Sequence, residues 1–129
     1  MIDFITRERN NANTDKEVSL SLTGSGTKKK PYRLNIAIND NGMLKMGNPE
    51  YITAAIVKEK DHIRCYFKST TSTEGFHGDK RSYKTRFCVP RLDKGKMQEM
   101  VGEYDLKFSK TYKYWYVEKE VIDFVGRGR

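Results

Sequence analysis

Apolar and polar residues alternate along most of this chain, which is the pattern of strands that bury one face. The alternation is clearest over residues 18–22, 32–38, 51–57, 62–67 and 83–89. The polar stretch KEKD separates two of these runs, and SKT separates YDLKF from YKYWYVE nearer the end of the chain. Short polar connections between such runs predict two hairpins.

One segment departs from the period of two. In DKGKMQEMVGEY, residues 93–104, the apolar residues Met97, Met100 and Val101 fall three and four positions apart, as they do on one side of a helix. Asp93 is a suitable amino-terminal cap, and Gly102 is suited to ending the helix. The segment therefore predicts a helix over residues 93–101 whose methionines pack on a sheet.

An earlier segment, DNGMLKMGNPEY at residues 40–51, has the same outline. Both segments open on Asp-x-Gly, close on Glu-Tyr and carry methionines between, and each lies between a strand and a hairpin. This order predicts a duplicated strand–turn/helix–hairpin unit with halves at 16–68 and 75–119. Coincidence is the alternative, since few positions are identical. Glycine and proline in the first copy leave room for one helical turn, near residues 43–47.

Together these elements predict a single α+β domain over residues 1–129. It should consist mainly of antiparallel strands, with the helix 93–101 packed on the sheet. The chain is 36% hydrophobic and 12% aromatic, which is enough for a folded core.

Charge narrows the classes of function. The net charge is +8, and an excess of positive charge favours polyanionic partners, of which phosphate backbones are the commonest. No apolar run is long enough to span a membrane, and the first residues lack the apolar stretch of a signal peptide. We therefore expect a cytoplasmic protein, with no membrane partner and with reduced cysteines.

Catalytic signatures are few. Two histidines and two cysteines could hold zinc, but His62 and Cys65 lie three apart in a predicted strand and point to opposite faces, and neither His77 nor Cys88 has a second ligand at close spacing. We expect no enzyme activity, no metal and no cofactor. A small metal-dependent nuclease that uses His77 and Asp79 is the remaining catalytic alternative.

Basic and aromatic residues carry the strongest functional signal. Lys84 and Arg86 share one face of the predicted strand 83–89. In KTYKYWYVEK the tyrosines alternate with Lys113 and Trp115, so one face of that strand should present aromatic rings to solvent. Rings beside cations are the arrangement that stacks the bases of a single strand. With the lysine-rich loop, the predicted nucleic-acid-binding residues are Lys28, Lys29, Lys30, Lys80, Arg81, Lys84, Arg86, Lys110, Tyr112, Lys113, Tyr114 and Trp115.

The sequence thus favours a non-catalytic nucleic-acid-binding protein, with single-stranded DNA or RNA preferred to duplex. The alternative is a small protein-interaction module, an inhibitor or adaptor, that docks its basic face on an acidic partner protein. Both hypotheses need the basic face, but only the first needs exposed aromatic rings. Open strand edges also allow a homodimer.

Overall fold

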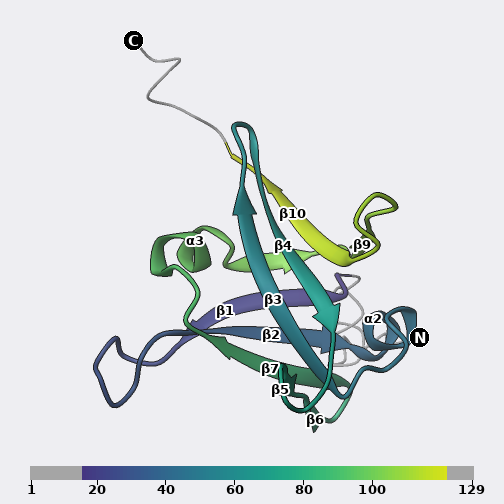
Figure 1. The fold of residues 1–129 in the computed structure, drawn as a ribbon, viewed down its shortest axis with the longest axis horizontal. Helices are drawn as coiled ribbons and strands as arrows, with labels where there is room; N and C mark the ends of the chain where they lie inside the picture. The colour runs from purple at the N-terminus through teal and green to yellow at the C-terminus, as the bar shows by residue number, and fades with distance from the viewer. Residues whose placement is uncertain (1–15, 122–129) are drawn as a thin grey trace, which may run out of the picture.

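The computed structural model describes residues 16–121, in which two antiparallel sheets of five strands pack face to face (Figure 1). Sheet A has the order β6-β7-β2-β1-β8 and sheet B the order β5-β3-β4-β10-β9. In Figure 1 the long strands of sheet B run steeply across those of sheet A. The predicted fold class, α+β with mainly antiparallel strands, is confirmed.

The strands of sheet A are β1 (Val18–Thr23), β2 (Arg33–Asn39), β6 (Asp79–Arg81), β7 (Lys84–Pro90) and β8 (Gly102–Tyr104). Those of sheet B are β3 (Tyr51–Lys58), β4 (His62–Ser69), β5 (Phe76–His77), β9 (Lys107–Phe108) and β10 (Trp115–Glu120). The hairpin β3–β4 was predicted from the sequence. The short strands β5 and β6 were not, because they lie in a stretch that reads as one long loop.

The alternation along each strand determines which side chains enter the core. Ile36 of β2 and Phe87 of β7 lie opposite each other in sheet A, and both are fully buried. They face Phe67 of β4 and Val117 of β10, which are buried from the side of sheet B. The other face of each sheet points outward, and these two outer faces lie on opposite sides of the molecule.

The predicted helix is present as α3 (Lys94–Glu99), but it is shorter than residues 93–101. Its cap is the expected one, because the Asp93 side chain accepts a hydrogen bond from the Lys96 N–H. Met97 and Met100 are buried, whereas Val101 is exposed. The helix ends early because Gly102 already belongs to β8, so Val101 does not complete the predicted stripe.

The first Asp-x-Gly segment also forms a helix, α2 (Asp40–Lys45), so the prediction of one turn near residues 43–47 is wrong. Its cap is Asn39, whose side chain accepts from the Gly42 N–H. Leu44 is 69% exposed, while Met43 is buried. Asn39 and Met43 in α2 therefore have the same roles as Asp93 and Met97 in α3, namely the cap and the buried methionine. The sequence comparison aligned Asp40 with Asp93, so it is shifted by one residue from the correspondence that the two helices show.

Corresponding strands of the two proposed halves lie side by side. In sheet A β2 pairs with β7, and Asn35 faces Cys88, 53 positions further along the chain. In sheet B β4 pairs with β10, where Cys65 faces Val117. Two copies related by a two-fold axis would pair in this way. Duplication remains a prediction, and this pairing is the structural reason to keep it.

The two cysteines should differ sharply in reactivity. Burial raises the pKa of the Cys65 thiol well above its ordinary value, so little thiolate forms at neutral pH. Cys88 is only half-buried, on the outer face of β7. We expect the variant C88S to react with a thiol-specific dye only after unfolding, and C65S to react in the native state. Rapid native labelling of C88S would contradict the buried placement of Cys65.

Candidate nucleic-acid interface

The outer face of sheet A has short side chains at its centre, cations on its β7 side and the carboxylate of Glu103, opposite Ser19, on its β8 side. Ser19 of β1 and Asn35 and Ala37 of β2 supply the centre. Arg86 lies opposite Ala37 on the neighbouring strand β7. Because the central side chains are short, a ligand could approach the backbone of this face closely.

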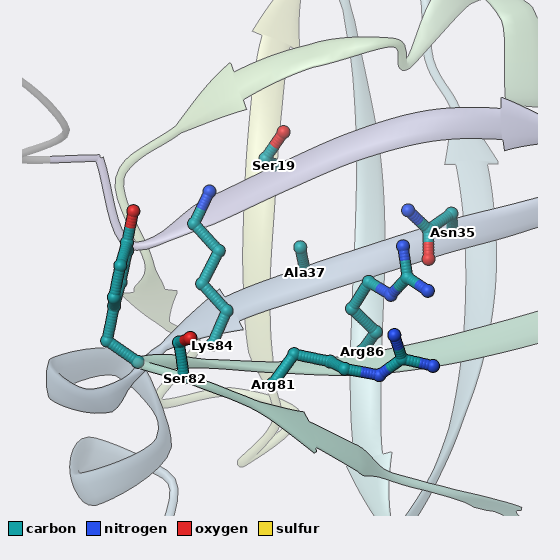
Figure 2. A pocket seen from close by; sticks show the side chains of 8 residues that line it. Ser19, Asn35, Ala37, Arg81, Ser82, Lys84 and Arg86 are labelled. Carbon is teal, nitrogen blue, oxygen red and sulfur yellow. The ribbon is translucent and has the colours of Figure 1, made fainter. Parts of the chain in front are cut away.

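Three cations converge beside this centre. Arg81 of β6 lies opposite Lys84 of β7, and Arg86 lies on the same face two residues further along. In Figure 2 the guanidinium groups of Arg81 and Arg86 extend side by side from neighbouring strands, and Lys84 rises from the same surface. Arg81 is paired with Asp79 at 2.8 Å. Neither Lys84 nor Arg86 forms an ion pair with any carboxylate of residues 16–121, so both charges are available to a ligand.

These side chains line a shallow depression of about 420 Å³. Its lining residues are Ser19, Asn35, Ala37, Arg81, Ser82, Tyr83, Lys84 and Arg86. Tyr83 is an exposed aromatic residue here, and the Lys84 ammonium lies 5.7 Å from its ring centre. The depression thus places cations, neutral hydrogen-bonding groups and an aromatic ring on the same surface.

Other predicted basic residues lie elsewhere. The loop between β1 and β2 contains Lys28, Lys29 and Lys30 and leads to Arg33. Arg33 pairs with Pro90, and Lys84 is at the opposite end of β7. The three lysines extend the cationic surface along the sheet and do not join its centre. Lys80 points away from the outer face, because its partner in β7 is the buried Thr85, and its ammonium is paired with Asp40 of α2.

The first three residues of the predicted strand YKYWYVE, residues 112–118, are not in a strand. β10 begins only at Trp115, and Lys113 has a left-handed backbone with φ of 64°. Tyr112 and Tyr114 lie in the turn and are exposed, the former by 60%. Trp115 packs on Phe108 with ring centres 5.0 Å apart and against the core, so it is on the inner face. The prediction that Trp115 offers its ring to a base therefore loses its structural basis.

The basic face and the aromatic hairpin do not form one surface. Arg81, Lys84 and Arg86 lie on the outer face of sheet A, whereas Lys110, Tyr112, Lys113 and Tyr114 lie beside sheet B. The sequence suggested a composite site because both stretches flank the helix 93–101. The packing of the two sheets separates them.

An aromatic cluster that was not predicted from the sequence lies on the outer face of sheet B. The ring of Tyr66 on β4 meets the ring of Tyr112 edge-on, with the ring centres 5.8 Å apart. The centre of the Tyr116 ring, on β10, lies 5.5 Å from that of Tyr66. Arg64 donates hydrogen bonds to the Tyr66 hydroxyl and to Glu118, and these bonds raise its pKa, so the guanidinium stays protonated. The alternation in HIRCYF already placed Arg64 and Tyr66 on one face, and this signal could have revealed the cluster.

The residues suggested for metal or hydrolytic chemistry have separate partners. His62 contacts Asp61 at 2.8 Å, and Cys65 on the same strand points into the core. His77 lies 3.7 Å from Glu50, while Asp79 is bonded to Arg81. No three metal-ligating side chains gather anywhere in residues 16–121. The nuclease alternative gains no support from these contacts.

No family model matches the chain, and no curated protein or solved structure shows significant similarity to it. Function must therefore be inferred from the geometry alone. Between residues 16 and 121, no helix has the length and apolar character needed to cross a membrane.

Proposed function

We propose that the protein binds single-stranded nucleic acid on the outer face of sheet A. The observation that carries this proposal is a pair of cations, Lys84 and Arg86, that form no ion pair with a carboxylate of the described residues; Asp79, which faces Arg86 across the β6–β7 pairing, is bound to Arg81 instead. They lie next to Arg81 on a surface of short polar side chains. Cations held on one face neutralise neighbouring phosphates and release their counterions, which is the main source of such affinity. The net charge of +8 supports the same class of partner.

A single strand is favoured over duplex by the groups beside these cations. Tyr83 offers an exposed ring next to Lys84, and a stacked base contributes about 1–3 kcal/mol. Ser19 at the centre is a neutral group that could meet an unpaired base edge, whereas the Asn35 amide is buried and already bonded to Ser21 and Cys88. A rigid duplex offers its bases only within its grooves, so it would use the cations and leave the tyrosine unused.

The test is a titration of the full chain with labelled single-stranded and duplex oligonucleotides of equal length at two salt concentrations. We expect tighter binding to the single strand, with an affinity that falls steeply as salt rises. Undetectable binding to both at low salt would refute the proposal. Such a result, together with a salt-sensitive complex with an acidic protein, would favour the interaction module.

A further inference from the structure

A second cationic hollow, which we call the loop hollow, lies at the other end of the outer face of sheet A. It has a volume of about 250 Å³ and is lined by Thr23, Gly24, Lys29, Lys30, Pro31 and Arg33. These residues come from the end of β1, the start of β2 and the loop between the two strands. In Figure 1 this loop projects from the end of sheet A that lies opposite α2. Among residues 16–121 no carboxylate lines the loop hollow, and its three cations form no ion pair.

The loop that carries two of these cations is closed by its own backbone. The N–H groups of Ser25 and Gly26 both donate to the Lys30 carbonyl, at 3.0 and 2.9 Å. These bonds close the loop shortly before β2 begins, so Lys29 and Lys30 lie beside Arg33. Their side chains are exposed, and three positive charges are therefore gathered at this end of the sheet, where a phosphate would be favoured.

Neutral side chains separate the loop hollow from the depression at Arg86. Ser21, Asn35 and Cys88 lie opposite one another on β1, β2 and β7, on the outer face of the sheet. None of the three is acidic or basic, and all are at least half-buried, so the surface above them is open to a ligand. The β2 position opposite Arg86 is four residues from Arg33, which is about 13 Å at the usual rise of a strand.

The charges across the sheet differ from those along it. Glu103 of β8 lies opposite Ser19 of β1, so a row of phosphates that crossed the sheet from β7 to β8 would approach a carboxylate. Lys16 lines the same small hollow as Glu103, but its ammonium is bound to Asp105 at 3.1 Å. Along β2, in contrast, the surface leads from one group of cations to another. The charges therefore favour a polyanion that runs parallel to β2.

We propose that a single strand of nucleic acid runs parallel to β2, with phosphates both in the depression at Arg86 and in the loop hollow. This inference rests on the proposed function and adds to it a second phosphate site and the direction of the strand. A separation of about 13 Å corresponds to about four nucleotides of a stacked strand, which rises about 3.4 Å for each phosphate, and to fewer of a stretched one. The two sites together then hold roughly the length that single-strand grooves usually bind, about 4–16 nucleotides.

The second phosphate site is tested by the variant K29E/K30E, which reverses two charges of the loop hollow. Its affinity for an oligothymidylate of about eight nucleotides should be roughly tenfold lower than that of the wild type at physiological salt. The slope of log affinity against log salt should fall by about 1.4, because about two phosphates are no longer neutralised. The matched control K110E/K113E makes the same change in net charge beside sheet B and should lose less than about twofold. Fluorescence anisotropy measures the affinities, and circular dichroism verifies that each variant is folded.

The direction is tested with a nitroxide attached to either end of the same oligonucleotide, by recording amide spectra of the wild-type chain. A strand parallel to β2 brings its ends to residues 24–31 of the loop and to Ser82 and Tyr83 between β6 and β7, so signals there should broaden most. Broadening centred on Glu103 of β8 would mean that the strand crosses the sheet, and would overturn the inference. Equal losses of affinity in the two charge variants would overturn the second site while binding to sheet A stands. Undetectable binding of the wild type at low salt would overturn the proposed function and this inference together.

Discussion

Reversing two charges on the outer face of sheet A, in the variant K84E/R86E, should reduce the affinity for a single-stranded oligonucleotide roughly a hundredfold at low salt. Both side chains lack a carboxylate partner among the described residues, so their charge is free for phosphate in the wild type. The slope of log affinity against log salt should also fall, by about 0.7 for each phosphate that the variant no longer neutralises. Fluorescence anisotropy at several salt concentrations measures both quantities.

The matched control is K110E/K113E, which makes the same change in net charge in the turn beside sheet B. It should change affinity only slightly, through the overall field, and that effect should disappear at physiological salt. Equal losses of affinity in the two double variants would mean that net charge alone attracts the ligand. A larger loss in K110E/K113E would place the ligand at the hairpin that the sequence suggested.

Truncation of a central core side chain should have the largest effect on stability. Phe87 is fully buried on β7, opposite Ile36, and its ring fills the space between the sheets. We expect F87A to lower the free energy of unfolding by about 3–5 kcal/mol, because it removes apolar burial and leaves a cavity. Urea denaturation followed by circular dichroism measures this change.

Tyr83 provides the control for that prediction, because it lies close to Phe87 in sequence but is exposed. Y83A should lower the free energy of unfolding by about 0.5 kcal/mol or less. It should instead weaken binding to single-stranded oligonucleotides, where its ring has a proposed role. If Y83A proved as destabilising as F87A, the exposed placement of Tyr83 in the turn between β6 and β7 would be wrong.

The local alternation of apolar and polar residues predicted most strands and the two faces of β7 from Lys84 to Val89, but Tyr83, predicted on the core face with Phe87, lies before β7 and is exposed. Lys84 and Arg86 do share an outer face, and Phe87 does enter the core. The helix cap at Asp93 was also foreseen, because capping depends on residues next to one another in sequence. These features are local, and one sequence contains enough information to specify them.

The predictions that failed concern features that depend on pairing between distant segments or on one backbone angle. Arg81 was among the predicted basic residues, but its position opposite Lys84 follows from β6, a three-residue strand that was not predicted. Tyr112 and Tyr114 read as strand because aromatic residues favour strands, but the left-handed backbone of Lys113 makes a turn there. The separation of the basic and aromatic surfaces follows from the division into two sheets. Strand patterns alone do not say which strands share a sheet.

Amide chemical-shift mapping with a short single-stranded oligonucleotide would locate the ligand directly. If nucleic acid lies on the outer face of sheet A, the largest shifts should fall on β1, β2 and β7, centred on Ser19, Asn35, Lys84 and Arg86. Shifts should then be small throughout β3, β4 and β10. Shifts centred instead on Tyr66 and the turn at Tyr112 would contradict binding on sheet A.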